Sequence, residues 1–230
     1  MSNAGCRIFL KVNRPKQELV EGFKGLPVAN IADEMNRFFC MDARIKPFNA
    51  KPLLGTAFTV KARVGDNLLL HKALELAQPG DVIIVDGQGS LANALIGEIM
   101  MTQAVVNGIA GVVVDGAIRD AEAMKALDIS VYAAGVQPKG PYKEGPGEIN
   151  VPVCCGGVVV NPGDIIVGDA DGIVVINSQD APRLLEKAKA KLANEQAIIK
   201  GIKDRIPRDK PWLDKGLEKA GCEIIDDYYK

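Results

Sequence analysis

The residues with the clearest capacity for chemistry stand at the two ends of one stretch, residues 97–120. Glu98 lies near its start, and Arg119 and Asp120 close it. An arginine offers a planar fork of N–H donors that matches a carboxylate, and carboxylate oxygens suit hard divalent cations. These three side chains therefore predict a site for an anionic ligand and a metal ion such as Mg²⁺ or Mn²⁺.

Two expected elements must position these side chains. Residues 109–115 contain a β-branched run between glycines, which predicts a strand buried on both faces, followed by a turn through residues 116–118. Arg119 and Asp120 then begin a segment rich in helix formers. A second helix is expected to begin at Gly97, after a loop over residues 87–97. Because ligands of α/β sheets bind where strand ends and helix N-termini converge, we predict the site at that edge.

The helix expected from Gly97 would add an anion cradle. The N–H groups of Glu98, Ile99 and Met100 have no partner in the first helical turn, and the helix dipole favours negative charge there. A simpler interpretation is that Arg119 and Asp120 form a surface ion pair and helix cap, while Glu98 merely suits a first turn. The residues alone leave both interpretations open.

Composition excludes several classes of partner. The chain has 230 residues, 28 Lys and Arg, 29 Asp and Glu, and a formal net charge of -1, so no basic surplus favours a nucleic acid. No apolar run approaches the roughly 18 residues of a membrane span, and no signal peptide opens the chain, so a cytoplasmic protein without a membrane partner is expected. Residues 1–4, MSNA, are expected to be an expression scar.

The cysteines and the single histidine limit the reaction classes. Five cysteines without paired CxxC spacing predict reduced thiols rather than a zinc site, and Cys154 and Cys155 are expected to be buried as small hydrophobic residues. His71 is expected on the face of a helix rather than as a catalytic base. Catalytic triads and histidine metal clusters are thus excluded.

The remaining chain predicts alternating helices and strands. Asp66 is expected to cap the helix at residues 67–77, and residues 135–147 form a polar loop that is either a mobile surface segment or a lid over a site. Two Pro-Gly-Asp turns are expected to lead directly into strands, and residues 169–172 are expected to form a tight hairpin. The other expected helices cover residues 17–25, 28–38 and 179–203; the other expected strands cover residues 55–63, 82–87, 131–133, 149–160, 165–167 and 173–176.

Three motifs carry a family resemblance over residues 28–201. They are GEIMMTQAVVNGIAGVVVDGAIRD, LDISVYAAGVQP and GEINVPVCCGGVVVNPGDIIVGDADGIVVI. The chain resembles the RraA-like proteins, in particular the class II 4-hydroxy-4-methyl-2-oxoglutarate aldolases. The resemblance implies a single layered α/β domain of the swivelling β/β/α kind over residues 5–203, including a C-terminal helix, with residues 204–230 as a tail or arm.

The resemblance also implies roles for individual residues. Asp120 matches the direct metal ligand, and Arg119 matches the arginine that binds the substrate carboxylate and keto group. Glu98, 21 residues before Arg119, matches an acid that holds metal-bound water, where some aldolases use aspartate. Lys143 matches a lysine of the aldolases, and Glu195 matches an acid that reaches metal-bound water from an adjacent subunit.

The implied activity is cleavage of 4-hydroxy-2-oxo acids to pyruvate, with oxaloacetate decarboxylation, in a homotrimer or a dimer of trimers. The implied cofactor is Mg²⁺ or Mn²⁺, with no organic cofactor. An alternative is an RraA-type protein that binds and regulates ribonuclease E without catalysis. A demethylmenaquinone methyltransferase, a third label in this family, is disfavoured because no glycine-rich strand-to-helix loop is present for the methyl donor.

Overall fold

The computed structural model describes residues 3–49 and 51–229, so residues 1 and 2 of the expected scar lie outside the described part. The chain divides into two compact units: the first ends at Ala190 and the second begins at Lys191. The first unit contains the whole sheet and the predicted site residues apart from Glu195.

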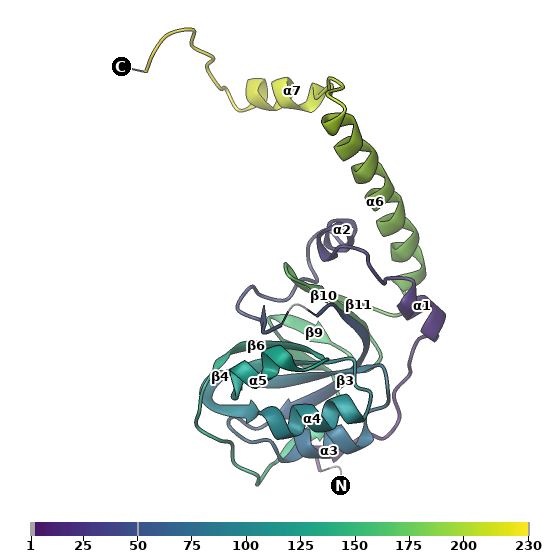
Figure 1. Cartoon of the computed structure of the whole chain (residues 1–230), viewed down its shortest axis with the longest axis vertical. Coiled ribbons are helices and arrows are strands. Elements are labelled where there is room, and N and C mark those ends of the chain that lie inside the picture. The colour runs from purple at the N-terminus through teal and green to yellow at the C-terminus, as the bar shows by residue number, and fades with distance from the viewer. Residues whose placement is uncertain (1–2, 50, 230) are drawn as a thin grey trace. The chain divides into compact units, whose positions relative to one another are not determined.

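Four parallel strands form the centre of the first unit (Figure 1). Each strand is connected to the next through a helix, as expected for βαβ units. In chain order these elements are β3 (Leu53–Ala62), α3 (Leu68–Leu76), β4 (Asp81–Ile96), α4 (Glu98–Val106), β5 (Gly111–Ile118), α5 (Ala121–Ala126) and β6 (Ser130–Val136).

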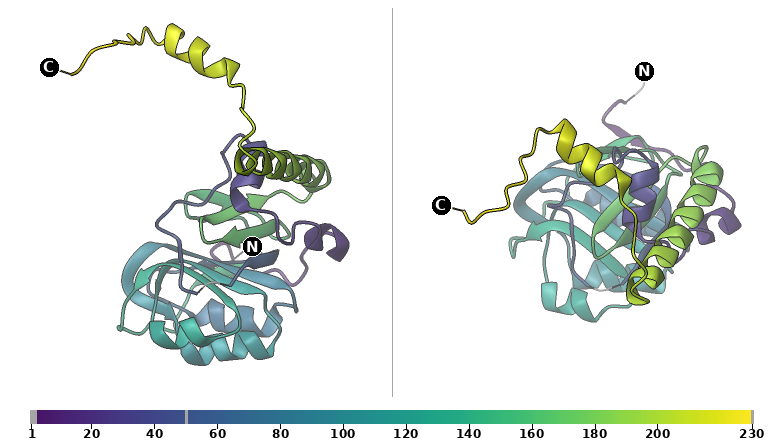
Figure 2. Two further views of the ribbon diagram at one scale, coloured as in Figure 1. Left: turned by 45° about the horizontal axis from the view of Figure 1, so that its top comes forward. Right: turned by 90° about the horizontal axis from the view of Figure 1, so that it is seen from above.

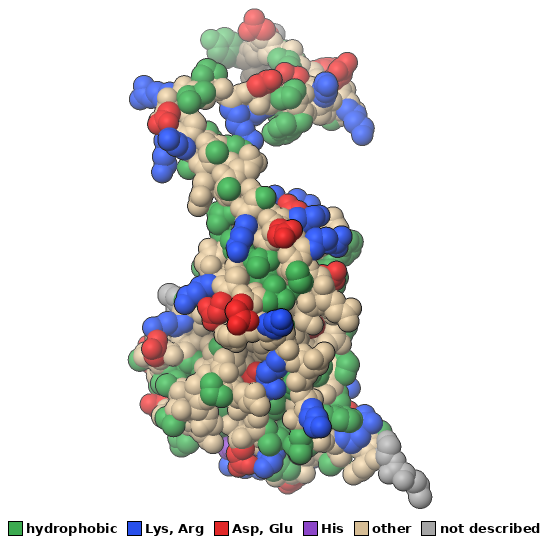
Figure 3. All heavy atoms as spheres, turned by 90° about the vertical axis from the view of Figure 1, so that its right-hand side faces the viewer, with side chains coloured by type: hydrophobic (Ala, Val, Ile, Leu, Met, Phe, Trp, Pro, Cys, Tyr) green, Lys and Arg blue, Asp and Glu red, His purple; other side chains and the backbone are tan. Residues whose placement is uncertain are grey.

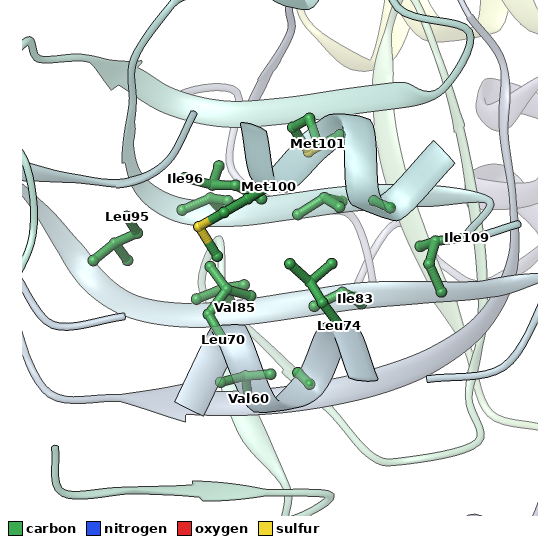
Figure 4. Packing of buried hydrophobic residues seen from close by; sticks show 14 of the residues in the cluster. Val60, Leu70, Leu74, Ile83, Val85, Leu95, Ile96, Met100, Met101 and Ile109 are labelled. Atoms are coloured by element: carbon green, nitrogen blue, oxygen red, sulfur yellow. The ribbon is translucent and has the colours of Figure 1, made fainter. Parts of the chain in front are cut away.

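The three connecting helices cover one face of this sheet. Their buried side chains, such as Leu70 and Leu74 of α3 and Met101 of α4, point onto alternate residues of the strands, including Ile83 and Val85 of β4 (Figure 4). Burial on both faces explains why the strands are continuous runs of β-branched residues. The packing of α3 and α4 side by side fixes the N-termini of both helices at the same edge of the sheet.

A second layer of strands covers the opposite face. Val82, Ile84 and Val113 point away from the helices and pack with side chains of β8 to β11, such as Val160 and Ile166. These strands are β8 (Val153–Cys155), β9 (Val158–Val160), β10 (Ile165–Asp169) and β11 (Gly172–Ile176). The layers are therefore strand, strand and helix (Figure 2), and the predicted layered α/β fold is confirmed.

Short elements complete both units. β1 (Cys6–Ile8) and β7 (Gly147–Ile149) extend the sheet beyond β3, and β2 (Lys46–Pro47) pairs with β6. α1 (Gln17–Glu21) and α2 (Val28–Glu34) are shorter than predicted, because Asn36 and Arg37 adopt positive φ angles that end α2. α6 (Ala181–Lys203) begins in the first unit, and α7 (Pro211–Lys219) lies in the second.

The predicted boundaries of β4 and β5 were wrong. Residues 87–96 were expected to form a loop, but β4 continues to Ile96 through bulges, and β5 continues through the expected turn to Ile118. The reason is pairing: Ser90, Ala94 and Ile96 re-enter the ladder opposite residues 116–118 of β5. The polar residues between them form the bulges, which are irregularities that a residue pattern does not reveal.

The prediction for the two adjacent cysteines was half wrong. Cys155 is buried, but Cys154 is exposed. Both lie in β8, and successive residues of a strand point to opposite faces, so only one of them can face the core. Among the described residues all five cysteines are free thiols, as the sequence predicted.

The turn predictions were confirmed. Asp81 and Asp164 end turns in which each donates its backbone N–H to residue i−3, and each side chain accepts the N–H of that same residue at 2.8 Å. Residues 169–172 form the tight hairpin between β10 and β11.

Basic and acidic side chains are intermixed on the face drawn in Figure 3. None of the helices in residues 3–49 and 51–229 combines the length and apolar content that a membrane-spanning helix needs.

Candidate functional site

The candidate site lies beyond the carboxyl ends of three neighbouring strands. Ile96 of β4, Ile118 of β5 and Val136 of β6 are aligned across the sheet. The chain continues as the strand ladder ends: the Arg119 N–H donates to Ile96 O at 3.0 Å, and the Gln137 N–H donates to Ile118 O at 2.9 Å. A cavity of about 140 Å³ opens at this edge, where the sequence analysis expected the site.

Asp120 is fixed by its backbone and by a helix N-terminus. It precedes α5 with φ 58° and ψ 42°, a left-handed conformation in which aspartate is enriched among non-glycine residues. Its Oδ2 accepts the backbone N–H of Glu98 at 3.0 Å and lies 3.7 Å from Nε of Arg119. The first amide of α4, expected to bind a ligand anion, thus holds the Asp120 carboxylate.

Gly97 leaves the room that this arrangement needs. A Cβ atom at Gly97 would lie 2.5 Å from Oδ2 of Asp120 and 3.0 Å from Nε of Arg119. Its φ of −142° and ψ of −173° are extended and open to any residue, so the backbone does not require glycine there. A side chain at position 97 would therefore displace the Asp120 and Arg119 side chains from this arrangement.

The loop that follows β6 forms another side of the cavity, to which Pro141 and Lys143 contribute. Its backbone is hydrogen-bonded to several elements in this arrangement. Lys139 O accepts the Ala94 N–H at 2.8 Å, and the Tyr142 backbone bonds to Gly65 and Asn67. Gly140 lies beside Arg119, since a Cβ there would be 3.1 Å from Nη1.

Asp66 connects this loop to the start of α3. Its Oδ2 accepts the N–H groups of Glu144 and Gly145 at 2.6 and 2.9 Å, and its Oδ1 accepts the Leu68 N–H at 2.9 Å. Burial alone would raise the pKa of Asp66, but these three N–H groups and the charge of Arg63 lower the pKa below its ordinary value. The predicted N-cap was wrong by one position, because Asn67 is the N-cap of α3, although Asp66 still accepts the N–H of Leu68, the first residue of the helix.

His71 and Asn67 of α3 also line the cavity. They are four residues apart, so they share one helix face. Burial lowers the pKa of His71, the positive charge of Lys143 lowers it further, and Glu75 partly opposes this. Asn67 is 3% exposed and donates through Nδ2 to Leu95 O at 2.9 Å, whereas its buried Oδ1 has no hydrogen-bond partner among the described residues.

The sequence analysis did not assign either residue to the site. A single histidine in a helix gives no sign of what it faces. The signal that could have found both is their place in the first turns of the helix that follows β3, since α4 and α5 follow the neighbouring strands in the same way.

The predicted site residues do not all come together in one unit. Arg119, Asp120, Lys143, Gly97, Ile99 and Met100 line the cavity. Glu98 contributes its backbone N–H to Asp120, while its side chain is exposed. Glu195 belongs to the second unit, where it forms an ion pair with Lys191 at 3.9 Å.

The donor set fits a largely hydrated divalent cation. Among the described residues, no three His, Cys, Asp or Glu side chains gather into a metal-binding group. Asp120 is 43% exposed at the cavity, with Oδ2 oriented by the Glu98 amide. One oriented carboxylate with space for water is a donor set that Mg²⁺ accepts, because this ion keeps several of its waters in proteins.

A second cavity, of about 310 Å³, is larger and is also lined by charged side chains, among them Asp164, Asp180 and Arg183. It lies between α2, β11 and the first turns of α6, and none of the predicted site residues lines it. Cavity size alone therefore does not locate the site.

The part of the chain that forms the cavity is matched by known proteins. A family model described as RraA-like, Aldolase/RraA, matches residues 28–175, which include Arg119, Asp120 and the cavity. A protein of Halalkalibacterium halodurans named "Putative 4-hydroxy-4-methyl-2-oxoglutarate aldolase" is 40% identical over 204 residues, covering 88% of this chain and 97% of the relative.

Two solved structures are similar to the first unit and carry other names. The RNA-processing inhibitor RraA from Thermus thermophilis has a TM-score of 0.61 and 35% identity, covering 65% of this chain and 92% of its own. A structure from Geobacillus kaustophilus is described as an S-adenosylmethionine: 2-dimethylmenaquinone methyltransferase. It has a TM-score of 0.62 and 36% identity, covering 66% of this chain and 94% of its own.

Proposed function

Since the chain belongs to the RraA-like family, we propose that it is a divalent-metal-dependent class II aldolase that cleaves 4-hydroxy-2-oxo acids to pyruvate. Acids of the 4-hydroxy-4-methyl-2-oxoglutarate type are the proposed substrates. The observation that carries the proposal is the pair Arg119 and Asp120 at one cavity, held together by Gly97 and the Glu98 amide. The ion pair and the cap of α4 are both present, and they hold the two side chains at a cavity with room for a ligand.

Arg119 is proposed to bind the 2-oxo acid end of the substrate. Its guanidinium lies between Gly97 and Gly140, where small residues leave its N–H groups accessible. A planar fork of donors suits a carboxylate with its adjacent keto oxygen. When the C3–C4 bond breaks, negative charge develops on the keto oxygen, and a fixed guanidinium nearby stabilises that charge.

Asp120 is proposed to hold a Mg²⁺ or Mn²⁺ ion directly, and no organic cofactor is proposed. Such an ion would act as a Lewis acid toward the keto oxygen. Glu98 and the partner subunit's Glu195 are proposed to orient waters at the same place. One of these waters would accept the C4 hydroxyl proton and return a proton to C3, so that pyruvate and a carbonyl product leave.

Lys143 is proposed to act on the part of the substrate beyond C3, because it reaches the cavity from the loop rather than from the strand ends. Oxaloacetate decarboxylation would follow from the same stabilisation of charge on the keto oxygen. The proposed assembly is a homotrimer or a dimer of trimers, which would allow Glu195 to act in a neighbouring site.

The decisive experiment is an assay of pyruvate release by the purified protein. Oxaloacetate and 4-hydroxy-4-methyl-2-oxoglutarate are each supplied with Mn²⁺, with Mg²⁺, or with a chelator. We expect release with either ion and its loss with the chelator. Absence of metal-dependent release from both substrates would contradict the aldolase proposal.

A second candidate is an RraA-type protein that regulates ribonuclease E by binding. The similarity to the Thermus RraA structure favours it, and Arg119 and Asp120 do not discriminate between the two functions. Glu98, Lys143 and Glu195 favour the enzyme, since a binding module needs none of these side chains at one site. Capture of an arginine-rich segment of the ribonuclease E assembly, without pyruvate release, would support this second candidate.

A further inference from the structure

The turns that lead into β4 and β10 share the sequence Pro-Gly-Asp but differ in one partner. Each turn ends in a buried aspartate, Asp81 or Asp164, and these residues are 1% and 4% exposed. Oδ2 of each aspartate accepts the N–H of the residue three positions earlier at 2.8 Å. Both turns therefore hold their carboxylate in the same way, so the surroundings of the two carboxylates can be compared directly.

The carboxylate of Asp81 is paired with a cation. Nε of Arg14 donates to Oδ1 at 2.9 Å, and Nη2 of Arg14 donates to Oδ2 at 2.6 Å. Burial of a carboxylate costs free energy unless opposite charge and hydrogen bonds compensate for the lost water, and the guanidinium supplies both. The turn before β4 thus shows which kind of group completes a carboxylate held in this position.

Asp164 has no such cation. Its two hydrogen bonds both come from Asn161 and both end on Oδ2, at 2.8 Å from the backbone N–H and 3.3 Å from Nδ2. Among the described residues no donor is hydrogen-bonded to Oδ1 of Asp164, and no basic side chain forms an ion pair with it. Burial raises the pKa of Asp164, and the two bonds from Asn161 only partly oppose this. One oxygen of a buried carboxylate is therefore left for a donor from outside the turn.

Asp164 lines the larger cavity, of about 310 Å³, between α2, β11 and the first turns of α6 (Figure 1). Apolar side chains form part of its walls, among them Met35, Phe39, Val175 and Leu184. Small-molecule pockets have volumes of about 300–1,000 Å³ and are mostly apolar, with a few polar groups that orient the ligand. The cavity has this character, and the Asp164 carboxylate is the polar group held most firmly by burial.

The other charges of the cavity balance one another. Asp180 and Arg183 lie 3.9 Å apart, with side chains that are 69% and 78% exposed. Glu34 and Lys187 add one further negative and one further positive charge. These four side chains sum to zero, so the Asp164 carboxylate gives the cavity a net negative charge. Such a cavity favours a cationic ligand over an anionic one.

We propose that this cavity is a second ligand site, which binds a small organic ammonium compound with an apolar body. The ammonium group takes at Asp164 the place that the Arg14 guanidinium takes at Asp81, and the apolar body lies against Phe39 and Leu184. None of the residues predicted for the strand-end site lines this cavity, so the assignment is independent of the proposed function.

The test compares three ligands that share a phenylethyl body. At neutral pH 2-phenylethylammonium is a cation, 2-phenylethanol is neutral and 3-phenylpropanoate is an anion. Their binding is measured by calorimetry on the full chain. We expect the cation to bind at least about tenfold more tightly than the alcohol, because a hydrogen bond to a charged group typically contributes a factor of this size. The anion should bind most weakly.

Two results with these ligands would overturn the site. One is binding of the anion as tight as that of the cation, since Arg183 and Lys187 rather than Asp164 would then select the ligand. The other is the lack of saturable binding of the cation, which is the result expected if water alone, or a side chain from a second copy of the chain, fills the cavity.

Asp164→Asn removes the charge and keeps an oxygen that can accept the Asn161 N–H. This variant should bind 2-phenylethylammonium about tenfold more weakly or worse, with unchanged affinity for 2-phenylethanol. The control is Asp171→Asn, which removes an exposed acid from the hairpin between β10 and β11 and should leave both affinities unchanged. Wild-type affinity for the cation in Asp164→Asn would overturn the assignment.

Val159→Trp tests the same cavity without altering the turn. Val159 lines the cavity and is 62% exposed, so a larger side chain there can occupy the cavity without crowding the core. We expect Val159→Trp to lose binding of both 2-phenylethylammonium and 2-phenylethanol, and unchanged binding would show that the ligands do not enter this cavity.

Asp120→Asn distinguishes the two cavities. It removes the acid of the strand-end cavity and should leave the affinity for 2-phenylethylammonium unchanged. Loss of binding in Asp120→Asn would place the cation at the strand ends and overturn the second site. Since none of these measurements uses pyruvate release, the second site and the aldolase proposal can fail separately.

Discussion

Asp120 combines a left-handed backbone with the charge proposed to hold the metal, and these two properties can be separated by mutation. Asparagine tolerates the left-handed region and is nearly isosteric, so Asp120→Asn should keep the stability of the protein while removing the charge. Alanine removes the charge and also tolerates the left-handed region poorly. Loss of groups around a metal typically costs 10- to 100-fold, so we expect each variant to lose about 100-fold or more of the metal-dependent kcat/KM.

The matched control for Asp120 is Glu122→Gln, which removes an exposed acid of α5 that pairs with Lys125 at 2.8 Å. Its kcat/KM should equal that of the wild type. Pyruvate release at the wild-type rate by Asp120→Asn, still stimulated by Mn²⁺, would show that Asp120 does not bind the ion. The interpretation as an ion pair and cap would then stand.

Gly97→Ala tests the close approach at the site rather than its charge. The added Cβ would lie 2.5 Å from the Asp120 carboxylate, so that side chain and Arg119 must move, while the extended backbone accepts alanine. We expect a fall in kcat/KM of about tenfold or more, since small misplacements of reacting groups are costly, with little change in Tm. Gly201→Ala, where a Cβ meets no atom within 4 Å, is the control. Unchanged kinetics in Gly97→Ala would contradict the described geometry.

At the scale of residues, the sequence identified the groups that stand directly after predicted strands. Arg119, Asp120 and the start of α4 could be placed because strand ends and helix starts leave local patterns. His71 and Asn67 could not be placed, since their contact with the cavity depends on how α3 packs beside α4. The same limit applies to Gly97. Its contacts are with Arg119 and Asp120, which lie 22 and 23 residues further along the chain.

The loop of residues 137–146 is anchored by Asp66, and this anchor can be tested by mutation. Asp66→Ala removes the acceptor for three backbone N–H groups, two of them next to Lys143. We expect a loss of roughly 1–3 kcal/mol in the free energy of unfolding, measured in urea, together with a higher KM. The control Asp128→Asn removes the charge of an exposed partner of Lys51, and it should leave the free energy of unfolding and the KM unchanged. If Asp66→Ala has the same stability and the same KM as the wild type, the loop does not depend on this anchor.

The pH dependence of this anchor follows from the sign of the pKa change. The pKa of Asp66 is below its ordinary value of 3.8 in the folded protein, so the folded state favours the carboxylate. The contribution of Asp66 to stability is therefore complete above pH 3.8 and is lost as the pH falls through the pKa that Asp66 has in the folded protein. The difference between wild type and Asp66→Ala should be constant from about pH 7 to about pH 5 and shrink only in stronger acid. A difference that disappears near neutral pH would contradict this.

At the scale of elements, the existence and order of the central strands were predictable, but the short strands β1 and β2 and the ends of the long strands were not. Runs such as Val112–Val114 identify buried strands by composition. The continuation of β4 to Ile96 depends on pairing across bulges with β5, and the alternation in β8 depends on which face meets the core. Such boundaries are decided by tertiary partners rather than by local propensity.

For the whole molecule, the layered fold was predictable because a family resemblance specifies topology, and the second β layer could not have been derived from periodicity alone. In the second unit, large apolar side chains are exposed, including Trp212 at 63% and Ile225 at 69%. Exposed apolar groups of this kind favour association, and the family resemblance implies a trimer or a dimer of trimers, which is the mass that we expect in light scattering. A monomer would remove the proposed role of the partner subunit's Glu195.

Mixing two inactive variants tests whether sites are shared between subunits. Arg119→Ala should lose about 10²–10³ in kcat, as when one charge-stabilising donor is removed, and Glu195→Gln should also be impaired. In a cyclic assembly of both variants, a site that takes Arg119 from one subunit and Glu195 from its neighbour is intact. Random mixing by co-refolding should restore about a quarter of wild-type activity, since each of the two positions is filled correctly half of the time.

The control for this experiment is a mixture of Arg119→Ala with Asp120→Ala, whose lesions are adjacent in the chain and line the same cavity. Every site in that mixture carries one lesion, so its activity should remain at the level of the separate variants. Equal recovery in both mixtures, or recovery in neither, would show that Glu195 does not complete a neighbour's site. Recovery confined to the mixture with Glu195→Gln would place each reaction between two subunits, because no other arrangement returns an intact set of groups.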